Sequence, residues 1–335
     1  MDSPNPFPIL RLPFLAIEEV FKAMNSFEII NFSMISKRTK SVTRQMTFYS
    51  KYSIRINASE MLEIWVAGPK YMTQCFYKFT TNQEINGEVV ENTWNSRNEL
   101  LVWKYSNNPV EEWKKLVKYV LEIFKKETID LLLMTMDAFV NQNVSTTDFL
   151  KTNVKSVNEC YLFQSVKEND INEHAAYLLK NIKITNAFSS YLHIKNDNFN
   201  GKIPKNLKEL KIHYSQWIGY ERLLEIDCKS VILEKNLITN KEWNMFFKKW
   251  IAMKTHLKLE YLEIDYRDIE KFRALVLHDI PHEVVDRRVK RTFKTRRNET
   301  QEISGGIDIK RIDGKTATLF VYRVFSTDRF AMSIH

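Results

Sequence analysis

The sequence predicts an α/β protein, α+β overall, in which a small three-helix module precedes a large domain of irregular repeats that ends in a β-hairpin. Three observations predict this class. Apolar residues recur at helical spacing before residue 50, runs of the form apolar-x-x-apolar-x-apolar recur after about residue 128, and paired strand signals lie near the end. We expect domains at residues 1–50 and 51–335, with the repeats in about 128–280.

The first expected helix begins at Pro13, whose missing N–H costs nothing in a first turn, and its apolar residues Ile17, Val20, Phe21 and Met24 form one stripe. A third helix is expected over about 37–49. Between them, a second helix is apolar on every side and therefore needs cover on more than one side. Its apolar residues are Phe27, Ile29, Ile30, Phe32, Met34 and Ile35.

About 45 residues cannot bury so many large side chains alone. Either the rest of the chain or another protein must cover them. The order Leu12-Pro13, Val20-Phe21, Met24, Glu28-Ile29, Phe32 and Ile35-Ser36-Lys37 resembles the F-box, over about residues 8–50. Phe14 and Leu15 depart from it, because an acidic residue commonly follows Leu-Pro in that family.

The F-box is a three-helix module that docks an exposed apolar face onto the Skp-family adaptor of a cullin–RING ubiquitin ligase. The resemblance therefore implies an adaptor and, through it, a cullin as partners. We expect Lys37 and Lys40 to add rim contacts to an acidic adaptor. The adaptor face, or the small core beneath it, would comprise Leu12, Pro13, Ile17, Val20, Phe21, Met24, Glu28, Ile29, Phe32, Ile35, Lys37 and Lys40.

Residues 50–106 read mainly as strands and turns, and a capped helix follows, with Asn108 as N-cap and Pro109 at its first position. The clearest repeat after it is Cys228-x-x-Val231-x-Leu233-x-x-Asn236, a leucine-rich-repeat signature in which Asn caps a turn. Other copies are Leu207/Leu210/Ile212 and Leu259/Leu262/Ile264, and weaker ones are Ser189/Leu192/Ile194 and Val157/Cys160/Leu162.

After the Asn236 copy, Thr239-x-x-Glu242 predicts a capping box, and the helix that follows carries Trp243 and Trp250 on its core face. Strand, turn, helix and strand in this order are the unit of a curved α/β solenoid. Because the repeat spacing is irregular, an ordinary α/β domain stays the alternative.

The segment 185–270 also resembles the type-two F-box-associated domain of nematode F-box proteins. The matching residues are Trp217, Leu223-Leu224, Asp227-Cys228, Thr239-Asn240, Trp250 and the run from Leu259 to Ile264. The resemblance implies a receptor that holds a protein substrate. We expect the inner strand surface to bind it, with Trp217, His213 and Tyr266 as candidate contacts.

The formal charge of +9 comes from one basic patch. The chain has 50 Lys and Arg in all, and those outside this seven-residue patch nearly balance the 41 Asp and Glu. We expect a polar loop there, with nuclear import or steering of an acidic partner as alternatives; a single aromatic, Phe293, gives little support for nucleic-acid stacking. The patch comprises Arg287, Arg288, Lys290, Arg291, Lys294, Arg296 and Arg297.

Near the C terminus, Asp313-Gly314 between two strand-like runs predicts a hairpin with a two-residue turn, and FAMSIH a last strand. Composition indicates an intracellular protein, cytoplasmic or nuclear: it is 44% hydrophobic, it has no signal peptide, and no apolar run reaches the roughly 18 residues of a membrane span. Cys75, Cys160 and Cys228 are too isolated for a metal site and read as reduced core thiols.

No catalytic, metal or phosphate-binding motif occurs, so we expect neither enzyme activity nor a cofactor. His278 and His282 are four residues apart, but Pro281 between them argues against a helical ligand pair. The leading hypothesis is a substrate-recognition subunit of an SCF-type ubiquitin ligase. The alternative is an intracellular scaffold or nucleic-acid-associated protein that uses segment 287–297 and folds its first helices onto its own domain.

Overall fold

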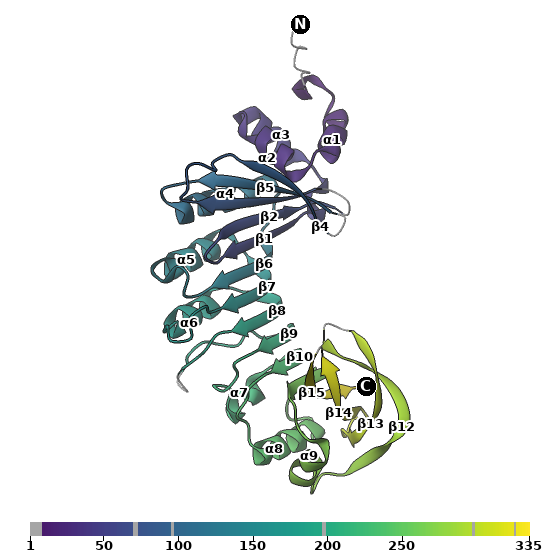
Figure 1. Cartoon of the computed structure of the whole chain (residues 1–335). Coiled ribbons are helices and arrows are strands. Elements are labelled where there is room, and N and C mark those ends of the chain that lie inside the picture. Colours follow the sequence, from purple (N-terminus) through teal and green to yellow (C-terminus); the bar gives the residue numbers. More distant parts are fainter. Residues whose placement is uncertain (1–8, 70–72, 95–96, 196–198, 297–298, 325) are drawn as a thin grey trace. The chain divides into compact units, whose positions relative to one another are not determined.

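The computed structural model describes residues 9–69, 73–94, 97–195, 199–296, 299–324 and 326–335. The chain forms two compact units, one of residues 1–134 with 141–158 and one of residues 135–140 with 159–335 (Figure 1). Helices at the N-terminal end are followed by a mixed α/β region, which confirms the predicted class. The first unit continues well past the predicted boundary at residue 50.

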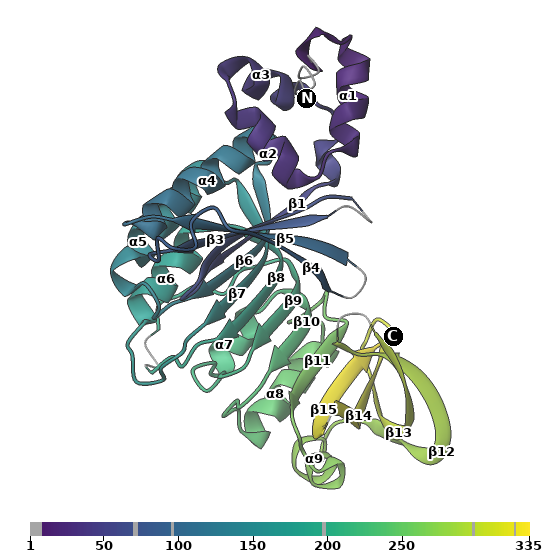
Figure 2. The ribbon, with the colours of Figure 1, turned by 45° about the horizontal axis from the view of Figure 1, so that its top comes forward.

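The first unit begins with the three expected helices (Figure 2). A capping box formed by Asn25 and Glu28 starts the second helix, and one formed by Ser36 and Thr39 starts the third. These caps explain why a continuous apolar stretch breaks into short helices. The elements are η1 Ile9–Arg11, α1 Phe14–Ala23, α2 Ser26–Met34, α3 Lys37–Gln45 and η2 Phe48–Lys51.

The sheet of the first unit has the strand order β6-β1-β2-β3-β5-β4. β1 pairs in parallel with β6, and β3 with β5, while the other neighbours are antiparallel. Asn108 caps α4 and Pro109 is its first residue, as predicted. The bounds are β1 Ser53–Ala58, β2 Leu62–Ala67, β3 Gln74–Thr80, β4 Val89–Trp94, β5 Arg97–Tyr105, α4 Pro109–Ile123, β6 Thr128–Thr135, η3 Val140–Gln142 and α5 Asn143–Asn153.

The second unit contains most of the predicted repeats. Its strand order is β7-β8-β9-β10-β11-β15-β14-β13-β12, and β8 to β11 are parallel. Four predicted copies coincide with strands, whereas the copy at Ser189 lies at the very end of β8. The bounds are β7 Ser156–Phe163, α6 Asn172–Asn181, β8 Ile184–Tyr191, β9 Leu207–Ile212, α7 Tyr220–Glu225, β10 Cys228–Leu233, α8 Asn240–Ile251, β11 Tyr261–Asp265 and α9 Ile269–Val276.

The predicted turn after β10 is confirmed. The Asn236 side chain donates to Leu233 O (3.4 Å) and accepts from Ile238 N (3.3 Å), so it satisfies backbone groups where the strand ends. Thr239 and Glu242 form the expected capping box at the start of α8. The four aromatic residues of α8 are fully buried on the helix side of the strands: Trp243, Phe246, Phe247 and Trp250.

The C-terminal strands correct two predictions. The basic segment is a long strand, β12, and not a loop. The hairpin between β13 and β14 has a three-residue loop, closed by the bond from Arg311 N to Lys315 O (2.8 Å), and Gly314 takes the positive φ (+90°) that such loops favour. The last predicted strand is confirmed as β15. The bounds are β12 His282–Lys294, β13 Thr300–Lys310, β14 Thr316–Val324 and β15 Thr327–Ile334.

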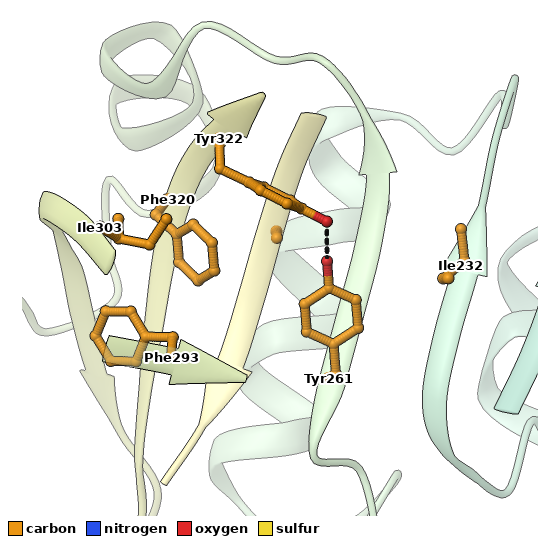
Figure 3. Close-up of a cluster of buried hydrophobic side chains, with 7 residues drawn as sticks. Ile232, Tyr261, Phe293, Ile303, Phe320 and Tyr322 are labelled. Atoms are coloured by element: carbon orange, nitrogen blue, oxygen red, sulfur yellow. Dashed lines mark hydrogen bonds between the residues drawn. The ribbon is translucent and has the colours of Figure 1, made fainter. Parts of the chain in front are cut away.

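These strands cover part of the sheet face that lies opposite α8. Ile232 on β10 and Tyr261 on β11 are buried against residues of the last four strands (Figure 3). The remaining members of this cluster are Phe293, Ile303, Phe320, Tyr322 and Ala331. The helices of the described residues are too short or too polar to span a bilayer.

The buried His256 makes stability depend on pH. Burial lowers its pKa from 6.5 to about 4, so the unfolded chain takes up this proton at a higher pH than the folded protein. The free energy of unfolding should therefore fall by about 3 kcal/mol as the pH falls from 6.5 to 4. In urea unfolding at pH 7 and pH 4.5, His256→Asn, which tolerates the local φ of +52°, should lose clearly less stability than the wild type. Equal losses would contradict a buried neutral imidazole.

Candidate protein-interaction surfaces

One side of α2 is covered by its own unit. Ser26 Oγ donates to Val66 O on β2 (3.0 Å), and Ser33 Oγ lies 2.9 Å from the Tyr119 hydroxyl on α4. Ile29 and Ile30 are fully buried. The chain itself therefore provides part of the cover that the apolar residues of α2 require.

The rest of the apolar surface stays open. Leu15 is 74% exposed and Ile35 is 72% exposed, with Phe14 and Met34 at more than 40%. Arg38 Nη2, at the start of α3, lies 3.5 Å from Leu10 O, so the segment before α1 lies beside the start of α3. We define the apolar N-terminal surface as Pro13, Phe14, Leu15, Met34 and Ile35.

The structure divides the twelve residues of the predicted adaptor face. Ile17, Phe21 and Ile29 are buried and belong to the core beneath, where the Phe21 and Phe32 rings meet edge to face. Glu28 accepts the bond that caps α2. Leu12, Val20, Met24, Phe32 and Lys40 are half-buried, and Pro13, Glu28, Ile35 and Lys37 are exposed.

Sequence reasoning missed Phe14, Leu15 and Met34 as surface residues. Phe14 and Leu15 entered only as departures from the family pattern, and Met34 only as part of an all-apolar helix. The all-round apolarity of α2 could have predicted exposed residues at its end. A helix that is apolar on every side leaves apolar residues exposed wherever its own unit covers only one side.

A second surface follows the carboxyl ends of the parallel strands in the second unit. The register aligns Ile212, Leu233 and Ile264, so the residues after them lie in one row. The Phe163 and Tyr191 rings stack at 5.0 Å, and the Tyr191 and His213 rings lie 5.5 Å apart. We call Phe163, Tyr191 and His213 the aromatic row; all three are half-buried.

The next member of this row is a buried carboxylate. Glu234 lies 2.6 Å from His213 Nδ1 and 3.4 Å from Lys211 Nζ, and Arg329 reaches it from β15 at 3.5 Å. Burial alone would raise the pKa of Glu234, but these positive charges outweigh it and hold that pKa below its ordinary value. His213 is thereby fixed by a charged partner.

A neighbouring carboxylate anchors the end of the basic patch. Glu263 on β11 is fully buried and accepts two bonds from Arg296 Nε, at 2.7 and 2.9 Å. The Tyr261 and Tyr322 hydroxyls also donate to Glu263, at 2.6 and 2.8 Å, and lie 2.7 Å from one another (Figure 3). This network holds the segment after β12 against β11.

The three candidate substrate residues lie in different environments. His213 belongs to the aromatic row, and Tyr266 is 53% exposed just after β11. Trp217 is buried, which corrects its predicted place on a binding surface. Its ring packs on Phe199 at 4.9 Å, with the Arg222 guanidinium 5.2 Å away, and so stabilises the segment before α7.

Most of the basic patch is neutralised within the second unit. Arg291 makes a two-pronged ion pair with Asp308 (2.7 and 3.0 Å), and Lys290 pairs with Glu302 (2.8 Å). Lys294 lies 3.8 Å from Glu260. Arg297 lies outside the described residues.

The cysteines are free and buried, as expected. Burial raises the pKa of the Cys75 and Cys228 thiols to about 12, which makes both unreactive at neutral pH. Within the described ranges, no three His, Cys, Asp or Glu side chains are placed to hold a metal ion.

Comparison with known proteins agrees with both resemblances. The F-box domain model matches residues 9–51, and the F-box associated model matches residues 198–264. The chain therefore contains an F-box domain and a segment of an F-box-associated domain. The exposed Leu15 and Ile35 lie inside the first match, and His213 and Glu234 lie inside the second.

The chain is also similar to the Skn-1 dependent zygotic transcript 15 protein of Caenorhabditis elegans. The two are 21% identical over 295 residues, which covers 79% of this chain and 81% of the relative. The likeness is consistent with a nematode F-box protein. No solved structure matches the chain.

The Glu263 network can be tested by removing its cation. Arg296→Ala should destabilise the protein by about 3 kcal/mol, because it leaves a buried carboxylate without its ion pair. Lys294→Ala, two residues away and largely exposed, should cost less than about 1 kcal/mol. Urea unfolding at pH 7 measures both. A loss of stability for Arg296→Ala no larger than that for Lys294→Ala would show that Glu263 does not depend on this contact.

Proposed function

We propose that the protein is a non-enzymatic substrate-recognition subunit of an SCF-type ubiquitin ligase. The observation that carries this proposal is the apolar N-terminal surface, which lies within the segment that matches the F-box domain. An F-box domain in general binds a Skp-family adaptor, and we propose that the adaptor connects this chain to a cullin. Such a complex would act inside the cell.

The adaptor would cover the side chains that the first unit leaves exposed. Leu15 and Ile35, the two most exposed of these, would lose most of their accessible surface in such a contact. Burial of two large aliphatic side chains stabilises an interface by about 3–6 kcal/mol before the costs of association. Ile17, Phe21 and Ile29 would hold the helices in place beneath.

A basic rim would accompany this apolar contact. Lys37 and Lys40 line a shallow depression on α3 together with Arg44 and Lys125. Glu122 pairs with Lys40 (2.8 Å) and Arg44 (3.2 Å). Because one carboxylate serves two cations here, the rim keeps a positive balance that suits an acidic partner.

The protein substrate would bind at the aromatic row and the exposed Tyr266. Half-exposed, firmly held rings at the carboxyl ends of parallel strands give contact area at low cost in side-chain entropy. Ubiquitin transfer would belong to the partner proteins. This chain would contribute by holding the substrate close to them, which raises its effective concentration.

The alternative function is that of a scaffold or nucleic-acid-associated protein. It predicts that the first helices pack on the chain's own domain, and α2 does pack partly on β2 and α4. Its nucleic-acid form requires free cations in segment 287–297. Lys290, Arg291 and Arg296 already have acidic partners, so this form has less support.

The adaptor surface can be tested by placing charges on it. Leu15→Asp/Ile35→Asp should bind a purified Skp-family adaptor at least about 100-fold more weakly, because an unpaired carboxylate would be buried in an apolar contact. Leu257→Asp/Ile312→Asp, on exposed residues of the second unit, is the matched control and should bind normally. Isothermal titration measures all three. Wild-type affinity in the first variant would refute the assigned surface.

A further inference from the structure

Strand β12 is the edge strand of the sheet in the second unit. One side pairs with β13, and no strand of the described ranges pairs with the other side. A free edge presents backbone N–H and C=O groups that can pair with an added strand. At 13 residues, β12 is long for an edge, and nearly all its side chains are exposed.

A bulge in the middle of β12 is built into both strands. The register shifts between Val285 and Lys290, where Gly305 lies opposite the extra residues. Gly305 has φ +73°, and a Cβ there would lie 3.2 Å from the Arg287 Cα and from Val285 O. The positive φ and the close approach both favour glycine here, so the bulge is a specified feature.

The bulge presents two arginines to solvent. Arg288 N donates to Asp286 Oδ1 (2.8 Å), which fixes the turn of the bulge. Arg287 and Arg288 are exposed, and no acidic side chain of the described residues forms an ion pair with either. We call them the bulge arginines. They concentrate the unneutralised charge of the basic patch at one point of the edge.

A small cavity of mixed polar and apolar lining lies beside the same bulge. Its volume is about 240 Å³, and its lining comes from Val284, Val285 and Arg287 of β12, from strands β13 and β14, and from Ile269 and Glu270 of α9. That is smaller than the roughly 300 Å³ at which small-molecule sites begin, so it suits one apolar side chain. Val284 is itself 50% exposed.

We propose that β12 binds an extended, acidic segment of another protein, which adds a strand to the free edge, places carboxylates against the bulge arginines and inserts an apolar side chain into the cavity. Strand addition gives affinity through the backbone, and the pocket and charges select the sequence. The same charges repel a second copy of this edge, which disfavours self-association. That the bound segment belongs to a ligase substrate rests on the proposed function. The binding of the segment to β12 does not require an adaptor.

The test uses the full chain and fluorescent eight-residue peptides in fluorescence anisotropy. An alternating Glu-Val peptide should bind saturably and more weakly at high salt, whereas a Lys-Val peptide should not bind. A Glu-Ser peptide, which keeps the charge but lacks the apolar side chains, should bind more weakly. Arg287→Glu/Arg288→Glu should weaken Glu-Val binding at least about tenfold.

The matched control reverses two other exposed charges of the second unit, Lys241→Glu/Lys254→Glu, and should keep wild-type affinity. The proposal fails if the wild type shows no saturable Glu-Val binding, if the bulge variant binds as tightly as the wild type, or if the Lys-Val peptide binds equally. The proposal also fails if the wild type binds an oligo-dT strand more tightly than the Glu-Val peptide and the bulge variant does not bind oligo-dT. That result would identify nucleic acid as the ligand of the bulge arginines. None of these outcomes depends on adaptor binding.

Discussion

A helix that is apolar on every side must be covered on every side, and α2 receives only part of that cover from its own unit. Strand β2 and helix α4 bond to Ser26 and Ser33 on one side, which fixes the orientation of the module on its sheet. Among the described residues, Phe14 and Leu15 at the start of α1 and Met34 and Ile35 at the end of α2 stay exposed. Because Ser26 and Ser33 lie near the two ends of α2, these bonds hold the helix in place beneath the exposed side chains, which lowers the cost of ordering when a partner binds.

In the second unit, buried charge has the corresponding role. Glu234 and Glu263 are carboxylates with almost no exposed surface, and each is tolerable only because cations reach it from other strands. Arg296 and Arg329 supply those charges and hold the C-terminal strands over β10 and β11. The aromatic row lies beyond this covered part, at the carboxyl ends of β7 to β9. The core that covers one end of the face thus borders the surface that we propose for a substrate.

Local sequence signals predicted the local structure well. The Asn236 turn and the Thr239–Glu242 capping box are made by residues within a few positions of each other, and their patterns were legible. Strand β12 was missed because only Phe293 is buried along it, which leaves no alternation to read. Its pairing depends on Arg291 and Asp308, which lie 17 positions apart. The partners of Glu234 likewise come from distant strands and could not be predicted without the register.

The central claim is that the exposed end of the three-helix module is covered by an adaptor. Hydrogen–deuterium exchange of the full chain, with and without a purified Skp-family adaptor, measures this directly. The account predicts slower exchange in residues 14–36 when the adaptor is added, with little change in strands β8 to β11. A complex that leaves residues 14–36 unprotected, or a chain that binds no adaptor at all, would contradict it.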